Sequence, residues 1–157
     1  MIDQTYDCMI HHQLIDTAYI HGPILDLKLI GFYAEDTFGG LPFYCFSIMK
    51  GMTSIGKITL RLGYHRETRI HGHVGYQIDE PHRGHHYAYY ALEMIKELAK
   101  AHGYRKLLVT TEATNERSIR IVMKSRGKLI DPNVTIPEDH IYYILGKRSL
   151  YLYEIEL

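Results

Sequence analysis

Apolar and polar residues alternate loosely over three closely spaced stretches in the first half of the chain. The third stretch shows the pattern well, with apolar side chains at Ile55, Ile58, Leu60 and Leu62. Alternation of this kind, with aromatic and β-branched residues, is typical of half-buried strands. Because the connections between the stretches are short, we expect an antiparallel meander. The three predicted strands are residues 24–33, 43–49 and 54–62.

The segments around this meander are polar or ambiguous. Residues 63–72 are predicted to form a loop, and residues 73–78 a fourth strand. Before residue 22 the pattern is ambiguous, and Gly22-Pro23 breaks any regular element there. One face of a short helix would accommodate the four apolar residues Met9, Ile10, Leu14 and Ile15.

After residue 88 the apolar spacing changes to the helical period. Apolar residues recur every three or four positions in 89–102, which predicts an amphipathic helix that Gly103 ends. A short strand over 105–111 follows, so a strand, a helix and a strand occur in succession. This order predicts a right-handed crossover and a locally parallel pair of strands. The apolar residues of the helix are Ala88, Ala91, Leu92, Ile95, Leu98 and Ala99.

The last third of the chain carries one more helix and several short apolar runs. Thr114 or Asn115 is suited to cap a helix over 116–126, and Gly127 is expected to end it. Residues 131–140 contain two prolines and are predicted to form a loop. The predicted strands are 128–130, 141–145 and 149–155, the last two turning at Gly146-Lys147.

The connection between the fourth strand and the first helix is suited to an anion. It contains Arg83, Gly84, His85 and His86 and leads directly into the helix. The first N–H groups of a helix lack helical partners, and the helix dipole favours negative charge there. Successive backbone amides in such a turn form a concave nest for a phosphate. The sequence therefore predicts a phosphate or pyrophosphate site at this turn.

Composition narrows the class of protein. The chain has 157 residues, 46% of them hydrophobic and 23% charged, which predicts one folded domain. A formal net charge of zero gives no basic field, so we expect no nucleic-acid partner. No apolar run is long enough to span a bilayer, and the N-terminus does not resemble a signal peptide. Two cysteines, Cys8 and Cys45, form no disulfide framework, so we expect a reduced, cytoplasmic protein.

Residues 83–88 resemble the acetyl-CoA motif of the GNAT N-acetyltransferases. That motif is Arg or Gln, two variable residues, Gly, one variable residue, and Gly or Ala. Arg83 fills the first position and Ala88 the last, whereas His86 stands where the family usually has Gly. The resemblance extends from about residue 43 to the end, and the N-terminal forty residues match poorly. Similar segments are 56–61, 72–76, 115–127, 136–140 and the Tyr-rich end of the chain.

The resemblance implies a fold and a cosubstrate. The fold would be the α/β GNAT acyl-CoA N-acyltransferase fold, a mixed, mostly antiparallel sheet flanked by helices, as one domain over 1–157. The pantetheine arm of acetyl-CoA would lie along the fourth strand, where it splays from the fifth, and the pyrophosphate on the turn. The implied cofactor-binding residues are Tyr76, Gln77, Ile78, Arg83, Gly84, His85, His86, Tyr87, Ala88, Asn115 and Ser118.

Two departures from the family pattern bear on activity. If the backbone at His86 needs a positive φ, strain follows; if it is already helical, the residue fits, and we favour this second interpretation. Val122 occupies the position where many GNAT enzymes carry a Tyr that protonates the leaving thiolate. Tyr151, Tyr153 or solvent would have to supply that proton.

The implied reaction is attack by a neutral primary amine on the thioester carbonyl, which needs a base and an oxyanion donor. A backbone N–H in 76–78 is the expected donor. His73 is the first candidate base and Glu112 the second, although His73 also fits a half-exposed strand residue and Glu112 a solvated charge. Adjacent residues His85 and His86 point apart, and no third ligand has a recognisable spacing, so we expect no metal site.

The sequence does not determine the acceptor, and two other functions are alternatives to acetyl transfer. The acceptor is a small-molecule amine, such as a metabolite, antibiotic or polyamine, or a protein amine, and Glu35, Asp36 and Glu112 would attract a cation. A non-catalytic acyl-CoA-binding sensor or scaffold is the alternative that His86 and Val122 favour. A nucleotide-phosphate binder lacks support, because no Lys-Ser/Thr pair follows the glycine. A homodimer is compatible with the aromatic C-terminal strands.

Overall fold

The computed structural model describes residues 17–33 and 41–157. The ambiguous N-terminal helix and the acidic pair Glu35 and Asp36 lie outside these ranges. The strands are β1 (Tyr19–His21), β2 (Asp26–Tyr33), β3 (Phe43–Lys50), β4 (Thr53–Arg61), β5 (Val74–Ile78), β6 (Lys106–Thr111), β7 (Gly127–Thr135) and β8 (Ser149–Glu156). The helices are α1 (Thr68–His71), the 3-10 helix η1 (Glu80–His82), α2 (Tyr87–Ala101), α3 (Glu116–Lys124) and α4 (Ile141–Ile144).

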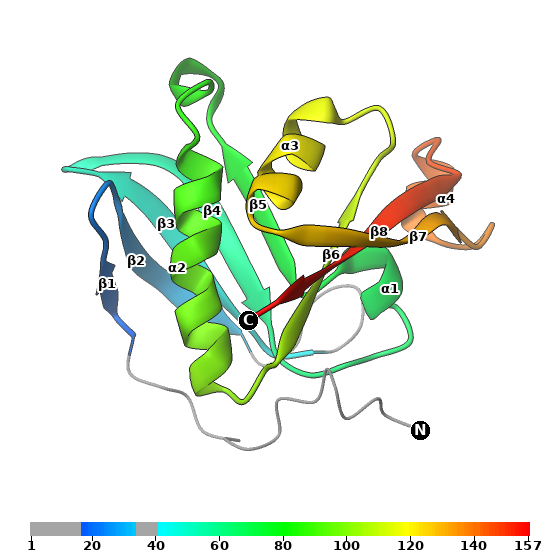
Figure 1. Ribbon diagram of the computed structural model, residues 1–157, viewed down its shortest axis with the longest axis horizontal. Helices are drawn as coiled ribbons and strands as arrows, with labels where there is room; N and C mark the ends of the chain where they lie inside the picture. Colours follow the sequence, from blue (N-terminus) through cyan, green and yellow to red (C-terminus); the bar gives the residue numbers. More distant parts are fainter. Residues whose placement is uncertain (1–16, 34–40) are drawn as a thin grey trace.

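The strands form two antiparallel sheets with α2 packed across one face of the larger (Figure 1). The larger sheet has the order β1-β2-β3-β4-β5, which confirms the predicted meander, and the smaller has the order β6-β8-β7. This arrangement of helices on mostly antiparallel sheets confirms the predicted fold class. No helix in the described ranges is long and apolar enough to cross a membrane.

Two groups of buried side chains form the core. The main group joins α2 to both sheets and includes Leu92 and Ile95, each fully buried, so the predicted amphipathic face is confirmed. The smaller group lies on the other side of β6 and β8, where Ile70 of α1 packs with Leu108 and Leu152. The small sheet is therefore covered on both faces, by α2 and α3 on one side and by α1 on the other.

The predicted parallel pairing between the fourth and fifth strands is wrong. β5 and β6 belong to different sheets, and a backbone hydrogen bond of 2.7 Å from His73 N–H to the carbonyl of Leu108 joins the two segments just before β5 begins. Gly72 lies against β6 at this point, since an added Cβ would come within 2.8 Å of the Leu108 carbonyl. The strands meet there and diverge beyond it, as the family resemblance implied.

Three predicted connections and strands are also wrong. The loop over 63–72 contains α1, and the loop over 131–140 contains the end of β7. β7 is an edge strand of its sheet, and its register shifts accommodate Pro132, which a central strand would not tolerate. Residues 141–145 form α4 instead of a strand, because β8 already pairs with β6 on one side and β7 on the other.

The helix ends agree with the sequence in two places and differ in a third. Asn115 caps α3, and Gly103 follows the last turn of α2 with φ 91°. At the end of α3 the left-handed residue is Arg126, with φ 66°, instead of Gly127. Gly127 is needed for a different reason, because a Cβ there would lie 2.4 Å from the side chain of Val122.

Candidate functional site

The outer edge of β5 faces the gap between the two sheets. At both ends of the strand the hydrogen bonds to β4 come from odd-numbered residues, the carbonyl of His73 and the N–H of Asp79. Because backbone groups alternate along an antiparallel strand, Val74, Tyr76 and Ile78 direct theirs away from β4. The edge therefore offers hydrogen-bonding groups to an extended ligand. Gln77, whose backbone faces β4, is also among the residues that line the gap.

The turn after β5 places Arg83 and the start of α2 beside this edge. Arg83 Nε donates to the carbonyl of Ile78 at 2.9 Å, so its guanidinium group is held against the end of the strand. Gly84 has φ 91°, and a Cβ built on it meets no atom within 4 Å, so its backbone is accessible from outside. The first backbone N–H groups of α2 follow directly and point towards the same space.

His86 is the N-cap of α2 and adopts the left-handed conformation, with φ 61° and ψ 20°. The expectation that its backbone is already helical is therefore wrong. A side chain in this conformation costs about 1 kcal/mol, although His tolerates it better than most residues. The carbonyl of His86 still accepts the first helical bond, from Tyr90 N–H at 3.2 Å. The position demands the backbone freedom of the glycine that the motif usually has.

The start of α3 forms the opposite wall. Asn115 Oδ1 accepts a hydrogen bond from Ser118 N–H at 3.1 Å, which caps the helix. The Ser118 hydroxyl forms a 2.8 Å hydrogen bond with the hydroxyl of Tyr76, which joins α3 to β5 across the gap. Burial raises the pKa of Tyr76, so this phenol stays neutral. The structure thus brings together the sequence-predicted residues of β5, the turn and α3.

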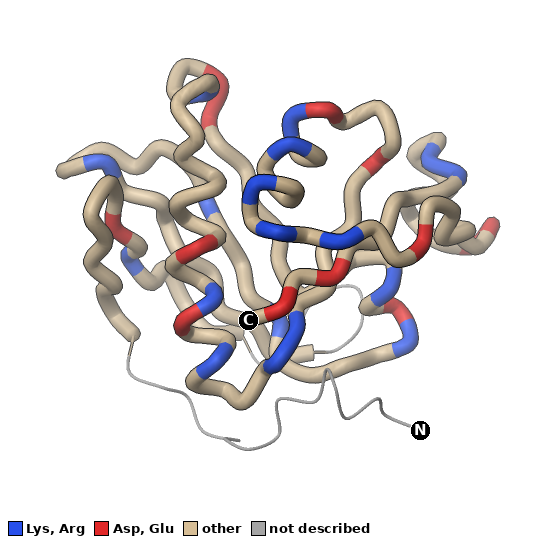
Figure 2. Tube along the Cα trace, in the orientation of Figure 1, with Lys and Arg blue, Asp and Glu red and all other residues tan. Residues whose placement is uncertain are grey.

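Two adjoining hollows lie between these walls, with volumes of about 330 and 320 Å³. Both are lined by Ile78, Arg83, Ala88 and Arg117. Figure 2 shows Lys and Arg gathered along α3, and Lys124 of this group lies 4.5 Å from the Tyr89 ring centroid. The cleft therefore combines backbone donors with a positive rim, an arrangement that fits a phosphorylated ligand.

His73, the first candidate base, lies in the interior. It is fully buried, its Nε2 lies 3.0 Å from the carbonyl of Gly63, and its Nδ1 accepts from Leu108 N–H at 3.0 Å. Desolvation lowers the pKa of His73 from 6.5 to about 3. Because both ring nitrogens bind the backbone and the ring stays neutral, these surroundings are those of a structural histidine.

Glu112, the second candidate, lies half-buried at the end of β6. It is close enough to Tyr142 to raise the pKa of that phenol, which burial raises first and the charge of Arg61 lowers. Tyr153 is buried in the main core, and Val122 is the fully buried residue on the inner face of α3. Tyr142 was not among the residues that the sequence singled out, because the helix that presents it was predicted as a strand.

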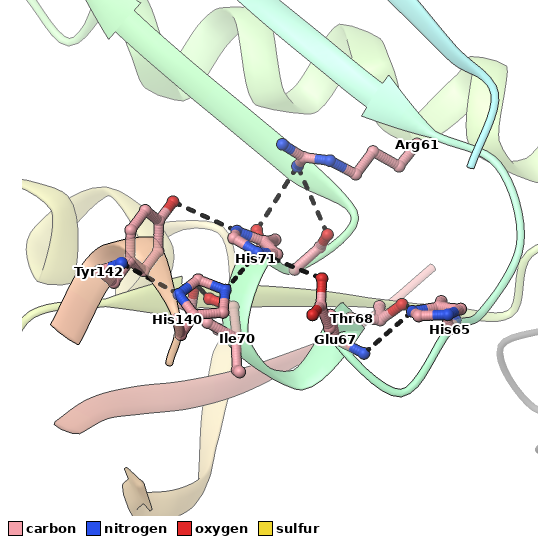
Figure 3. Close-up of polar contacts among 10 residues, drawn as sticks. Arg61, His65, Glu67, Thr68, Ile70, His71, His140 and Tyr142 are labelled. Atoms are coloured by element: carbon pink, nitrogen blue, oxygen red, sulfur yellow. Dashed lines mark hydrogen bonds and ion pairs between the residues drawn. The ribbon is translucent and has the colours of Figure 1, made fainter. Parts of the chain in front are cut away.

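A second polar cluster lies at the corner between α1 and α4 (Figure 3). The Nε2 atoms of His71 and His140 are 3.1 Å apart, and Glu67 Oε2 lies 4.0 Å from His71 Nε2. His71 Nδ1 is 3.3 Å from the Tyr142 hydroxyl. Sequence analysis missed this cluster, because His71 and His140 are 69 positions apart and no spacing links them.

Solved structures share this architecture at low sequence identity. A putative acetyltransferase has a TM-score of 0.64 and 11% identity, over 92% of this chain and 89% of that one. The Salmonella typhimurium enzyme that modifies the N-terminal serine of ribosomal protein L7/L12 has a TM-score of 0.57 and 13% identity, over 73% and 64%. The microcin C7 self-immunity acetyltransferase MccE, solved with acetyl-CoA and AMP, has a TM-score of 0.56 and 11% identity, over 73% and 61%.

The chain thus covers less than two thirds of the microcin and ribosomal enzymes. No curated protein matches the sequence itself. At these identities the structural likeness shows the fold alone. The sequence family described as "Acetyltransferase (GNAT) domain" matches residues 24–128, most of the chain, and includes β2 to β6, α2 and α3. The chain belongs to the GNAT acetyltransferase family.

Proposed function

We propose that the protein transfers the acetyl group of acetyl-CoA to a primary amine. The main support for this proposal is the cleft. It is lined by the outward backbone of β5, the donor-rich turn at the start of α2 and the capped start of α3. Several of the structural neighbours were solved with acetyl-CoA or CoA, which supports this cosubstrate.

In this proposal the arm of the cosubstrate lies along β5 as an added strand. Tyr76 supplies a backbone N–H and carbonyl, and the pyrophosphate binds the backbone N–H groups of Gly84 to Ala88. Arg83 and Arg117 at the rim favour the negative charge. Asn115 and Ser118 flank the arm on the side of α3. The side chains of His85 and His86 extend into solvent at the mouth of the turn.

The chemical step is a direct displacement. The lone pair of the amine attacks the thioester carbonyl carbon, a C–N bond forms, and the oxyanion accepts a hydrogen bond from an outward N–H of β5. The intermediate collapses as the C–S bond breaks, and the electron pair leaves with the sulfur as thiolate. The amine loses one proton to a base, and one proton reaches the thiolate. A thiol pKa of about 8.5 makes the thiolate a tolerable leaving group even without a strong acid.

Glu112 is the base that we retain. It lies at the end of β6, on the strand that diverges from β5, and its carboxylate is partly accessible. His73 is not retained, because its ring nitrogens bind the backbone and its pKa of about 3 makes it a poor proton acceptor. The phenol of Tyr142 lies within electrostatic reach of Glu112 and is better placed than the buried Tyr153 to protonate the thiolate.

The acceptor is proposed only as a primary amine, either a small molecule or a protein N-terminus. The ribosomal neighbour modifies an N-terminal serine, whereas the microcin neighbour is an immunity enzyme. The ribosomal neighbour therefore supports a protein N-terminus as one class of acceptor, and the proposal includes small-molecule amines beside it.

Ligand binding and turnover test the proposal separately. Acetyl-CoA and CoA should raise the melting temperature of the full chain, whereas ATP should raise it much less, because a ligand that binds only the folded state stabilises it. No shift with CoA would contradict the cleft assignment. Release of free thiol should then depend on an added amine. Binding without release over a broad amine panel would favour the alternative, a non-catalytic acyl-CoA sensor or scaffold.

A further inference from the structure

We propose that Glu67, His71 and His140 bind a divalent transition-metal ion, with Zn²⁺ the best match, at the corner between α1 and α4. These residues are the group of potential ligands that the described residues bring together, with one donor atom each and all three atoms within 4.8 Å of one another. Two imidazoles and a carboxylate form a ligand set that zinc uses in proteins. The three ligands lie outside the residues that line the cosubstrate cleft, although Tyr142 contacts His71 here and is also the proposed proton donor of the transfer reaction.

The distances are close to those that a zinc ion needs. Zinc bonds of about 2.0–2.1 Å at tetrahedral angles place neighbouring ligand atoms about 3.3 Å apart. The two imidazole Nε2 atoms are already 3.1 Å apart, and the carboxylate of Glu67 lies 4.0 Å from His71. Glu67 is half-buried at the N-cap of α1, one turn before His71, so a rotamer change brings its oxygen closer without moving the helix.

The surroundings of His71 suit a metal ligand. The residue is buried, and its Nδ1 is positioned to donate to the hydroxyl of Tyr142 at 3.3 Å. Figure 3 shows Nε2 of His71 facing Glu67 and His140, so with the proton on Nδ1 its lone pair is directed towards them. A ring nitrogen held by an outer hydrogen-bond partner is the usual arrangement around metal-binding histidines.

His140 makes binding detectable through the backbone. Its Nδ1 accepts a hydrogen bond from Tyr142 N–H at 3.0 Å, so without metal its proton lies on Nε2 and is shared with His71. A metal ion on Nε2 takes the place of that proton and moves it to Nδ1. Tyr142 N–H then loses its acceptor, and the capping bond at the start of α4 opens. Metal binding should therefore increase hydrogen exchange at the Tyr142 amide specifically.

A neighbouring hollow provides the fourth coordination position. The hollow has a volume of about 520 Å³, and Glu67, His140 and Asp139 line it together with Arg66. Water from this hollow can therefore complete the coordination, and a small anionic ligand can reach the ion from solvent. An ion here would tie α1 to the segment before α4, so it should stabilise this corner.

The test is metal binding by the full chain. We expect one Co²⁺ per chain, with the visible absorption of a four-coordinate ion, and its displacement by Zn²⁺. His140→Asn is the decisive variant, because Asn keeps an acceptor for Tyr142 N–H but has no ligand at the Nε2 position. We expect it and His71→Ala to lose the absorption, and Glu67→Gln to weaken Co²⁺ binding at least about tenfold.

His21→Ala is the matched control, because this exposed histidine lies on β1 and should leave Co²⁺ binding unchanged. Circular dichroism of each variant establishes that it is folded. The proposal is overturned if the wild-type chain binds no Co²⁺ or Zn²⁺, or if folded His140→Asn binds Co²⁺ as tightly as wild type. In either case the contact between His71 and His140 is an N–H···N hydrogen bond alone.

Discussion

The cosubstrate cleft, between β5, the turn before α2 and the start of α3, presents mainly backbone groups. The histidine corner, formed by Glu67, His71 and His140, presents side chains. The cleft presents backbone groups and exposed cations, contributed by segments that are short and continuous in the chain. The corner presents the buried side chains of His71 and His140 and the half-buried carboxylate of Glu67, which come from α1 and from the N-terminal ends of α1 and α4. A site made of backbone depends on local conformation, whereas a site made of side chains depends on how distant segments pack.

The two regions meet at Gly72 and His73. These residues link α1 to β5, and both contact β6 at Leu108. A change at this joint should therefore disturb both regions, whereas a change in one region that touches neither the joint nor the shared Tyr142 should leave the other intact.

The largest expected effect is the pH dependence that His73 imposes on the joint. The pKa of His73 is lowered to about 3 in the folded chain and is 6.5 when unfolded, so acid favours the unfolded state. As the pH falls from 6.5 towards 3, the free energy of unfolding should decrease by up to about 1.4 kcal/mol per pH unit. Urea denaturation at a series of pH values measures this slope.

His73→Gln provides the comparison, because Gln offers hydrogen bonds but does not titrate. The variant should be less stable at neutral pH by about 2 kcal/mol and should show a shallower slope between pH 6.5 and 3. An equal slope in both proteins would assign the acid sensitivity to other groups. The alkaline limb of the acetyl-transfer rate should not change, since His73 is not the base.

Gly72→Ala should disrupt the contact between residue 72 and β6 by a steric clash. Gly72 has φ 69°, and an added Cβ would lie 2.8 Å from the Leu108 carbonyl, so we expect a loss of about 2–3 kcal/mol in the free energy of unfolding. Gly51→Ala is the matched control, because Gly51 has φ 61° but open space around it. It should cost about 1 kcal/mol. Equal losses would mean that the contact with β6 does not constrain residue 72.

Asn115 tests the cleft without touching the corner. Asn115→Ala removes the cap of α3 and should cost about 1 kcal/mol of stability. Asn115→Asp keeps a capping oxygen but adds a negative charge beside the cleft. It should keep the stability of wild type and weaken CoA binding about fivefold, the effect of about 1 kcal/mol of repulsion. Calorimetric titration with CoA distinguishes the two variants, and unchanged CoA affinity in Asn115→Asp would place the anion elsewhere.

The smallest effect is expected at the two left-handed residues, His86 and Arg126. Glycine at either position should raise the free energy of unfolding by about 1 kcal/mol, because it removes the cost of a Cβ at positive φ. CoA affinity should stay within about twofold in His86→Gly, since backbone N–H groups are the proposed ligands of the anion. A larger loss in His86→Gly, with none in Arg126→Gly, would assign a direct role to the imidazole ring of His86.

The sequence predicted most of the cleft, because its information is local. The alternation of β5, the motif from Arg83 to Ala88 and the cap at Asn115 each occupy one short segment. The conformation of His86 was predicted incorrectly, because a single residue between a turn and a helix can belong to either. Gln77 illustrates another limit, since only the observed register shows that its backbone faces β4.

The corner was not predicted, because it depends on tertiary pairing. Residues 141–145 read as a strand from their apolar and aromatic composition, and only the occupied edges of β8 make α4 the better solution. The burial of His73 likewise depends on β6 passing beside it, which no spacing encodes. The single-domain organisation over 1–157 stays a prediction.

The hydrogen bond from Arg83 to the carbonyl of Ile78 limits the length of β5 that is open to a ligand. β5 is closed at one end, where His73 N–H bonds to β6, and its last outward carbonyl is occupied by the guanidinium group. From His73 to Ile78 there are five residue steps, about 17 Å of extended chain. An arm that pairs with β5 therefore fits a slot of fixed span. The open span of β5 therefore limits the length of the acyl group, because one much longer than acetyl would meet the junction with β6.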